Sequence, residues 1–427
     1  MKSRSLRWFG ILTLFIVAAI SYIDRINISV LVMDHAFLDH LGIEAGDRIR
    51  QGSFATVFLV GYGLSSILLT PFCSAALGVR RSLVYGLACW GTLTLATTVV
   101  HGYGLILTSR LLLGLSEGPL YSLAAAYIKA HFANHESGKP NAFVNMGTGI
   151  GLAIGYPLVS YLVASFDWQT SFLAIGLLNL ALGIPLVIAF VRMPGDEPSG
   201  ASSSPSHPAL AVRQVVAGAL QTRHLALITI LTSAALAYLW GSSNWLPAYL
   251  SLSRGFSLRE MGWLASLPQY AMVLGVLTGG VVLDKLQPRQ VSGMFMAGSL
   301  CVALSVWLTI RTADRYWAVA GMVAANFFWG LQAPAIPGAV QDNTRAEYTA
   351  SAFGVVNGIG SLIAGLMPLA MGGFMRSMST GSGGTASGFH AGFALLIGTQ
   401  AIVFACGMAL WGRSRISVDP VTAKPTS

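Results

Sequence analysis

Residues 8–33 read WFGILTLFIVAAISYIDRINISVLVM, an apolar run in which an acid and a base, Asp24 and Arg25, stand side by side. A helix of about 20 apolar residues spans the hydrocarbon core of a bilayer, so this run is long enough to cross a membrane. Ionisable side chains at that depth are costly, and they usually face a cavity or a charged partner. The segment therefore predicts a transmembrane helix beside a pathway for a polar or charged solute, with a purely structural ion pair as the alternative.

The rest of the chain has the composition of a membrane protein. Of its 427 residues, 54% are hydrophobic and only 10% are charged, and the mean hydropathy is +0.66. Soluble domains carry about a quarter charged residues, so a single water-soluble core is excluded. We predict an all-α membrane protein with twelve transmembrane helices, over residues 8–33, 52–74, 82–100, 103–128, 140–164, 169–191, 224–250, 260–283, 290–310, 315–340, 349–375 and 389–411.

The longest polar interruption divides these spans into two blocks of six. Residues 194–208 are rich in Pro, Ser, Gly and acids, as flexible linkers are. We therefore expect an N-terminal six-helix bundle at 1–193, a cytoplasmic linker at 194–222, a C-terminal six-helix bundle at 223–415 and a disordered tail at 416–427.

The two blocks resemble each other in sequence. Residues 142–157 read AFVNMGTGIGLAIGYP and residues 352–368 read AFGVVNGIGSLIAGLMP, so both begin with Ala-Phe and continue to an Asn, a glycine run and a proline. Glycines let membrane helices approach closely, and proline kinks them. Two pseudo-symmetric six-helix halves are typical of transporters that rock about a central site.

The basic residues are distributed as an orientation signal. If both chain ends are cytoplasmic, sixteen Lys and Arg residues fall in inside loops and tails and seven in outside loops, while Arg25 and Arg110 lie within spans. Cytoplasmic loops carry an excess of Lys and Arg. Topology thus explains the net charge of +9, and we expect no nucleic-acid partner. The four cysteines lack the spacing of a metal site, so we expect neither a metal nor a cofactor.

Four charged residues lie within predicted spans. Asp24 and Arg25 are neighbours and point about 100° apart on a helix, so one can face a cavity while the other meets an adjacent helix. Arg110 and Glu117 lie seven residues apart in the fourth span, on one face and about 10 Å apart along the axis. An ion pair between these two is just within reach, and a substrate or a residue of the first helix can also sit between them. Arg110 has the further alternative of reaching out to the membrane surface.

An acid and an arginine in one cavity suit proton-coupled uptake of an organic anion. Burial favours the neutral form of a carboxyl group and a nearby arginine favours its charged form, so solute binding can change protonation. The arginine fork matches a carboxylate bidentately. Four further polar or aromatic residues are candidates for the cavity lining, although each alone is more often a packing or helix-bridging group: Tyr62, Trp245, Gln332 and Asn357.

Three segments of this sequence, at 22–29, 110–119 and 245–250, resemble motifs of one family. That family is the major facilitator superfamily, specifically its anion:cation symporter branch of bacterial sugar-acid and organic-anion transporters, which is related to animal organic-anion and vesicular glutamate carriers. Residues 22–29, YIDRINIS, resemble its Y-x-D-R-x-N-x-S opening, and residues 110–119, RLLLGLSEGP, resemble its R-x3-G-x2-E-x-P segment. Residues 245–250, WLPAYL, resemble its W-x-P-x-Y-L motif. The resemblance covers residues 8–412.

The resemblance implies roles for individual residues. Asp24 and Glu117 would carry protons, Arg25 would contact the substrate carboxylate, and Arg110 would hold Glu117 or bind near it. Tyr22, Tyr62 and Asn357 match cavity positions that bind substrate. Thr148 stands where sugar-acid carriers often have Gln. Smaller hydroxy or dicarboxylic acids and aromatic acids are therefore possible substrates as well as sugar acids. We expect a cytoplasmic gate or helix-cap network at Arg80, Asp284 and Arg289, although the loop before Arg80 lacks the acid of the family motif.

The sequence thus favours a proton-coupled symporter that imports an organic carboxylate by alternating access. It would be a monomer in contact with lipid in the bacterial inner (plasma) membrane, with the proton as coupling ion. An organic-anion exchanger or exporter of the same fold is the first alternative. A membrane-embedded enzyme or a solute sensor is the remote one, since neither a catalytic His/Cys/Asp cluster nor a soluble output domain stands out in the sequence.

Overall fold

The computed structural model describes residues 2–73, 77–132, 138–193, 217, 220–283, 286, 288–343, 349–379 and 384–416. In these ranges the regular structure is helical, with no strand. The first half contains α1 (Lys2–Leu31), α2 (His35–Leu41), α3 (Arg48–Phe72), α4 (Val79–Ala96), α5 (Tyr103–Glu117), α6 (Leu120–His131), α7 (Gly138–Ser165), α8 (Trp168–Leu177), the π-helical η3 (Leu178–Gly183) and α9 (Ile184–Phe190). The second half contains α11 (Leu225–Ala248), η4 (Tyr249–Ser253), α12 (Leu258–Leu283), α13 (Pro288–Arg311), α14 (Arg315–Gln332), α15 (Ala335–Asn343), α16 (Thr349–Ala364), α17 (Leu366–Ser379) and α18 (Gly384–Ile416).

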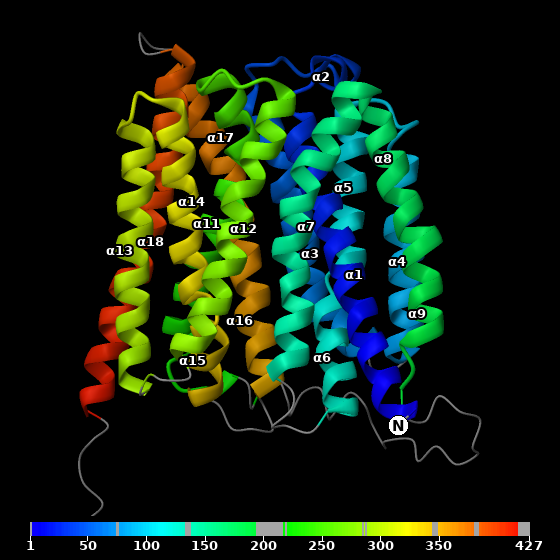
Figure 1. Cartoon of the computed structure of the whole chain (residues 1–427), viewed down its shortest axis with the longest axis vertical. Coiled ribbons are helices and arrows are strands. Elements are labelled where there is room, and N and C mark those ends of the chain that lie inside the picture. Colours follow the sequence, from blue (N-terminus) through cyan, green and yellow to red (C-terminus); the bar gives the residue numbers. More distant parts are fainter. Residues whose placement is uncertain are drawn as a thin grey trace, which may run out of the picture.

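These helices form twelve membrane spans. Within the described residues, nine stretches are long and apolar enough to span by themselves. The other three spans are α4, the pair α5–α6 and the pair α14–α15 (Figure 1). The spans predicted at 103–128, 315–340 and 349–375 are each built from two helices. The first two break at Pro119 and Pro334, because a proline cannot donate to the preceding turn, and the third breaks at Gly365. The short helix α2 was not predicted; it runs from the N-cap Asp34 to Gly42, whose φ is 64°.

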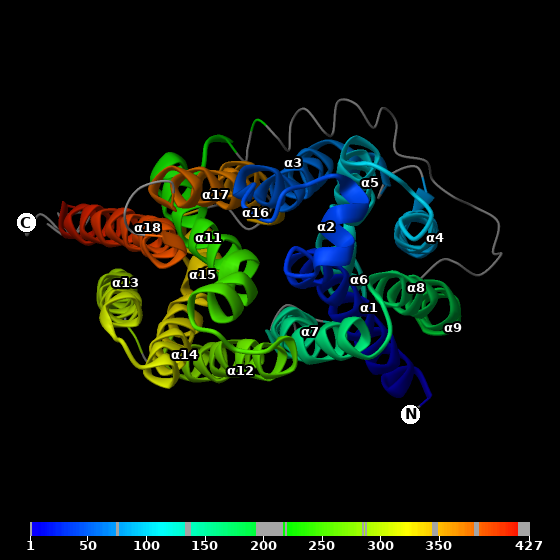
Figure 2. The same cartoon turned by 90° about the horizontal axis from the view of Figure 1, so that it is seen from above.

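The two halves lie side by side, with α1–α9 in one and α11–α18 in the other (Figure 2). They meet where α7 packs on α12 and where α3 packs on α16 and α17, with α1 touching α11 between them. When the membrane spans are numbered along the chain, these are the contact of span five with span eight and the contact of span two with span eleven. A two-fold operation that exchanges span n with span n+6 turns one contact into the other, so the interface has the symmetry that the sequence repeat predicts.

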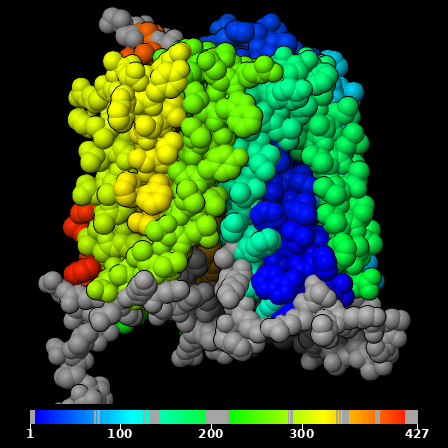
Figure 3. Space-filling view, viewed as in Figure 1, coloured from blue at the N-terminus to red at the C-terminus, as the bar shows by residue number. Residues whose placement is uncertain are grey.

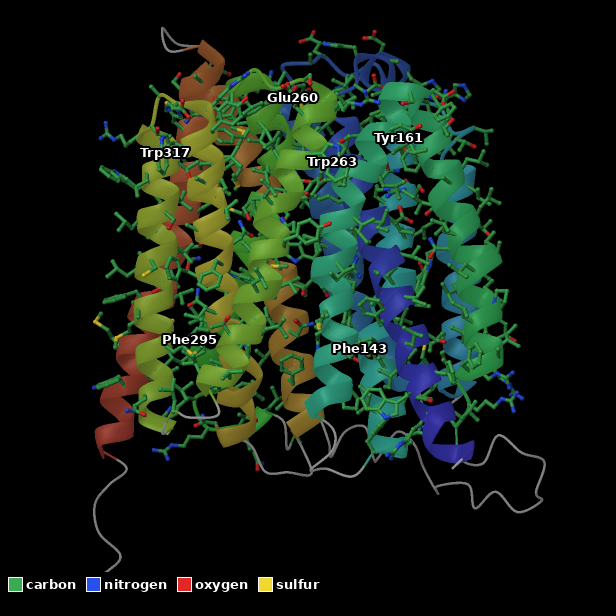
Figure 4. All side chains as sticks on the ribbon, viewed as in Figure 1. Phe143, Tyr161, Glu260, Trp263, Phe295 and Trp317 are labelled. Atoms are coloured by element: carbon green, nitrogen blue, oxygen red, sulfur yellow. The ribbon has the colours of Figure 1, made fainter. Side chains whose placement is uncertain are left out.

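The outer surface is suited to lipid. Tyr161 on α7, Trp263 on α12 and Trp317 on α14 lie near one end of the bundle and are 50%, 63% and 73% exposed (Figure 4). Tyrosine and tryptophan gather at membrane–water interfaces because their rings are apolar and their tips polar. In the space-filling view, part of α1 is uncovered between α7 and α9 (Figure 3). The protein is therefore a multi-pass membrane protein with an aromatic belt at this end.

We call the end of the bundle that carries α2 the α2 face, and the opposite end, where α1 begins, the N-terminal face (Figure 1). Three of the helices that begin at the α2 face have acidic N-caps: Asp47 for α3, Asp167 for α8 and Asp314 for α14. Each carboxylate accepts hydrogen bonds from backbone N–H groups of the first turn, which have no partner within the helix. At Asp167, hydrogen bonds from the Thr170 side chain and backbone N–H lower the pKa below its usual range.

The two halves are in close contact at the α2 face. A Cβ on Gly372 of α17 would lie 2.3 Å from the Arg48 carbonyl oxygen of α3, so only glycine permits this approach. The Trp245 indole N–H donates to the Pro368 carbonyl oxygen at 2.9 Å, which holds α11 on α17 beside the same contact. Arg376 Nη1 lies 3.7 Å from Asp47 Oδ1 across the two halves. The contact closes this end of the space between the halves.

Gly372→Ala is expected to separate α3 from α17 at the α2 face. The added methyl group meets backbone, which cannot move aside, and overpacking of this kind costs about 1–3 kcal/mol. A cysteine introduced by Ala55→Cys on α3 should then react faster with a membrane-impermeant thiol reagent added at the α2 face. Gly373→Ala is the matched control, because a Cβ there meets nothing within 4 Å. Equal reaction rates in the two variants would show that this contact does not close the α2 face.

Candidate functional site

Close packing of α1 on α7 positions the charged residues of the first span. A Cβ on Gly151 of α7 would lie 2.4 Å from the Ala19 carbonyl oxygen and 2.9 Å from the Tyr22 Cβ. The next residues of α1, Asp24 and Arg25, are consequently buried in the bundle, with 0% and 6% of their surfaces exposed. The glycine run of the fifth span thus lets α1 approach α7 closely, while the α1 charges themselves meet α4 and α5.

The four membrane-embedded charges form two crossed ion pairs. Arg25 Nε on α1 lies 2.9 Å from Glu117 Oε2 on α5, and Arg110 Nη1 on α5 lies 3.5 Å from Asp24 Oδ1 on α1. All four side chains are almost fully buried. The pair between Arg110 and Glu117 that the sequence suggested is not formed, because each residue of α5 meets its counterpart on α1. Two acids and two bases leave the ionised cluster with no net charge.

Each acid is also held by a hydroxyl group. Ser21, one turn before Arg25, donates to Glu117 Oε2 at 2.8 Å, and Thr94 of α4 donates to Asp24 Oδ2. The other oxygen of Glu117, Oε1, is buried and has no hydrogen-bond partner among the described residues. Glu117 therefore keeps one oxygen available for a proton while the other holds Arg25.

Arg25 is enclosed by aromatic rings and offers a free fork. The guanidinium carbon lies 4.3 Å from the ring centre of Tyr22, 4.7 Å from Tyr62, 5.1 Å from Phe58 and 5.8 Å from Trp240. Its Nε is used by Glu117, whereas Nη1 and Nη2 are buried and have no hydrogen-bond partner within the described ranges. Ring faces attract the cation and fix its plane. The two terminal nitrogens can donate two parallel hydrogen bonds to the two oxygens of a carboxylate.

A small cavity lies between the halves next to Arg25. Its volume is about 20 Å³, room for about one water molecule. Its polar lining consists of Arg25, Ser29, Arg110, Ser243 and Asn244, and its apolar lining of Ile26, Ile28, Phe54, Ala55, Phe58, Leu59 and Trp240. The two halves must therefore separate before a solute larger than water can reach Arg25.

Hydrogen bonds cross between the halves beside this cavity. Ser29 Oγ of α1 donates to Asn244 Oδ1 of α11 at 3.0 Å, and Tyr156 Oη of α7 donates to the Ser243 carbonyl oxygen at 2.7 Å. Both bonds are buried, and both must break when the halves separate. A solute that enters between α1 and α11 can replace the first of them, since Ser29 and Asn244 line the cavity.

The structure brings some of the other predicted residues to Arg25 and places others elsewhere. Tyr22 and Tyr62 contact its guanidinium, and Thr148 is linked to them through Tyr121, whose Oη lies 2.6 Å from Thr148 Oγ1 and whose ring meets Tyr22 edge-on. Asn357 is half-buried on α16, which packs on α3.

Two candidates for the cavity lining lie away from the cavity. Trp245 belongs to the closed contact at the α2 face, where its ring faces Gly52 and Gly372. Gln332 packs against Gly298 of α13, on the side of α14 that faces its own bundle. Neither is among the residues that line the cavity beside Arg25.

Of the predicted gate residues, Arg80 is placed by the structure. Its Nη2 donates to the Ile188 carbonyl oxygen in the last turn of α9, which caps that helix end. Asp284 lies outside the described residues, and for Arg289 the structure describes the backbone of α13 and not the side chain.

Sequence reasoning missed four residues of the site: Ser21, Thr94, Trp240 and Asn244. For Asn244 a signal was present, because residues 242–244 are a Ser-Ser-Asn run inside an apolar span. Ser21 lies one turn from Arg25, and this i,i+4 spacing also pointed to a shared partner. Thr94 gave no such signal, since threonine in a membrane helix commonly bonds to its own backbone.

Asp24→Asn is expected to destabilise the protein by leaving Arg110 buried without a counter-ion. Breaking a buried ion pair from one side costs about 3–5 kcal/mol, whereas removing both charges is often close to neutral. The thermal unfolding midpoint in detergent should therefore fall for Asp24→Asn and recover in Asp24→Asn combined with Arg110→Met. Asp39→Asn, an exposed acid on α2, is the control. Failure of the second substitution to restore stability would show that the pair is not the cause.

Comparison with known proteins supports the transporter reading of this geometry. The family model of the Major Facilitator Superfamily matches residues 14–368, most of the chain. This chain belongs to the major facilitator superfamily. Its twelve helices in two pseudo-symmetric bundles are the fold of that superfamily, whose members are transporters and not enzymes.

The relatives of this superfamily member include organic-anion carriers. It is 24% identical to the probable galactarate/D-glucarate transporter GudP of Bacillus subtilis (strain 168), over 87% of this chain and 86% of that protein. It is 26% identical to the probable sulfoacetate transporter SauU of Cupriavidus necator, over 79% and 80% of the two chains. Among solved structures, a bacterial homologue of the human lysosomal transporter Spinster has a TM-score of 0.79 at 16% identity, over 98% of this chain and 99% of that one. That likeness shows the fold alone.

Proposed function

We propose that this protein is a symporter that imports an organic carboxylate anion together with protons, by alternating access. The relatives named above carry sugar acids and sulfoacetate, all of which are organic anions. The proposal rests on the hydrogen bonding and the surroundings of the Arg25 side chain. Glu117 occupies its Nε, its two terminal nitrogens are buried without a hydrogen-bond partner among the described residues, and Arg25 lines a cavity between the halves.

The charges of the cluster supply a reason for proton coupling. The two ion pairs are neutral as they stand, so a bound carboxylate adds one buried negative charge. Buried charges that are not compensated cost several kcal/mol. A proton on Glu117 removes that charge and releases Arg25 for the substrate. Anion and proton then bind together, and neither is stable in the site alone.

The predicted proton-coupling and substrate-binding residues each have a place in this proposal. Glu117 and Asp24 carry protons, and Arg25 holds the carboxylate in a cage that includes Tyr22 and Tyr62. Arg110 keeps Asp24 in position next to the cavity. Thr148, through Tyr121, and Asn357 meet the substrate once the halves have separated, whereas Trp245 belongs to the closure of the α2 face and Gln332 supports α14.

The orientation follows from the distribution of charge. We propose that the α2 face is external and that both chain ends are cytoplasmic, since the acidic N-caps Asp47, Asp167 and Asp314 lie at the α2 face and most Lys and Arg residues fall at the other end. The protein would act as a monomer in the bacterial inner membrane. The bundles at 1–193 and 223–415 would rock about the α7–α12 and α3–α17 contacts.

Transport in proteoliposomes tests the proposal. An inward proton gradient is expected to drive accumulation of a radiolabelled carboxylate from a panel that includes galactarate, benzoate and sulfoacetate. Counterflow without a pH gradient is the second measurement. Counterflow that occurs while an inward proton gradient drives no net accumulation would identify an exchanger, and accumulation driven only by an outward gradient would identify an exporter. Either result would overturn proton-coupled import.

A further inference from the structure

We infer that the carboxylate carried by this protein has a flat aromatic body and a single anionic group, such as benzoate or a hydroxybenzoate. This inference rests on the proposed function, since it concerns the solute of the same cavity. Its basis is the chemistry of the wall that surrounds Arg25, which differs from what a polyhydroxylated acid requires.

The wall beside the Arg25 fork is aromatic. Phe58 and Trp240 line the cavity and also face the guanidinium, while Phe54 lines it one helical turn earlier on α3. Trp240 is stacked on Tyr22, with ring centres 6.0 Å apart and planes 14° apart. A solute whose carboxylate takes Nη1 and Nη2 of Arg25 places its body against these rings. Aromatic rings prefer offset-stacked and edge-on contacts with one another, so a flat ring suits this space.

The neutral polar groups of the cavity lining are few. Ser29 and Asn244 Oδ1 bond to each other at 3.0 Å, which leaves Ser243 Oγ and the Asn244 amide nitrogen as the neutral polar groups of the wall. A hexarate brings four hydroxyl groups in addition to two carboxylates. Most of those hydroxyls would face Ile26, Phe54 or Leu59, and a buried hydroxyl without a partner weakens binding. Ser243 and Asn244 together can hydrogen-bond to one hydroxyl group of the solute.

The charge of the cavity sets how many protons each class of acid requires. Arg110 also lines it; its Nη1 lies 3.5 Å from Asp24 Oδ1, and its Nε and Nη2 are buried without a hydrogen-bond partner among the described residues. A second carboxylate at Arg110 would require that Asp24 be neutralised as well as Glu117. An acid with one carboxylate needs only Arg25 and one proton.

Ligand-induced stabilisation of the purified protein measures the preference directly. Benzoate and 4-hydroxybenzoate are compared with galactarate and D-glucarate at pH 6, and benzyl alcohol serves as the uncharged control. We expect Kd values for the aromatic acids that are at least about tenfold lower than for the hexarates, which at equal concentration gives the larger rise in unfolding midpoint. Hexarates that bind as tightly as the aromatic acids, or more tightly, overturn the inference.

A pair of variants locates the preference in the cavity. Ala55→Ser adds a hydroxyl group to the lining, and the ratio of galactarate Kd to benzoate Kd is expected to fall by about 2- to 10-fold. Ala401→Ser makes the same chemical change on the exposed surface of α18 and should leave the ratio unchanged. A ratio that moves equally in both variants, or in neither, contradicts the assignment to this cavity.

The outcomes separate this inference from the proposed function. Hexarates that bind and accumulate with protons while benzoate does not would refute the aromatic preference and support carboxylate symport. Aromatic acids that bind without being driven by a proton gradient would support the preference and refute the coupling. If no carboxylate stabilises the protein, both are wrong.

Discussion

Arg25→Lys is expected to weaken carboxylate binding by about 10- to 100-fold, the effect of losing about 1.5–3 kcal/mol of charge-assisted hydrogen bonding. Lysine keeps the positive charge but presents one ammonium group in place of a planar fork. In this site Nε contacts Glu117, and Nη1 and Nη2, which have no hydrogen-bond partner among the described residues, hold the substrate in the proposed binding mode. An ammonium group that stays on Glu117 cannot also hold a carboxylate with two parallel bonds.

The measurement is the Kd of the best-bound carboxylate, determined by its effect on thermal unfolding, together with the initial rate of uptake. Arg259→Lys makes the same substitution at an exposed position at the start of α12 and should change neither quantity. If Arg25→Lys binds the carboxylate as the unmodified protein does, the terminal nitrogens of Arg25 are not the anion site. In that case Arg110 is the remaining cationic group of the cavity wall.

The membrane spans and the buried charges were predictable because their physical causes act within one segment. A spanning helix must satisfy its backbone groups internally, so its length and apolar character are visible in the sequence. Arg110 and Glu117 were expected on one face of a helix because seven residues are nearly two turns. The structure confirms that both are buried on the same helix, α5. The direction of Asp24 away from Arg25 followed from the same geometry.

The pairing of the charges was not predictable, because it depends on how α1 is placed against α5. Spacing along a helix shows which residues share a face, but it does not show which helix packs against that face. The glycine run on α7 sets that placement, since contact with Gly151 fixes the position of α1 along the bundle. Trp240 was missed for the same reason, since it joins the cage around Arg25 only through contact between the two halves.

Glu117→Gln is expected to abolish accumulation against a gradient while leaving carboxylate binding and exchange intact. Glutamine has nearly the same shape as glutamate, and its side-chain oxygen can still accept from Ser21 and from Arg25 Nε. It cannot take up or release a proton near neutral pH. The accumulation ratio under an inward proton gradient should fall to about 1, and counterflow should continue.

The pH dependence of binding distinguishes this from a general loss of function. In the unmodified protein, a carboxylate and Glu117 compete for Arg25, so lowering the pH from 8 to 5 should strengthen binding as Glu117 takes up a proton. In Glu117→Gln the competitor is permanently neutral, and the Kd should be tight and nearly constant over that range. Glu44→Gln, an exposed acid in the loop after α2, should behave as the unmodified protein does.

Stability supplies an independent test of the same variant. Without the Glu117 charge, Arg25 is a buried cation with no counter-ion, which costs about 3–5 kcal/mol. A bound carboxylate restores the counter-ion, so the rise in unfolding midpoint on adding ligand should be larger in Glu117→Gln than in the unmodified protein. A variant that is destabilised and gains nothing from the ligand would mean that Glu117 supports the fold and does not compete with the substrate. A variant that still accumulates the carboxylate would place the coupling proton elsewhere, and Asp24 is the other acid of the cluster.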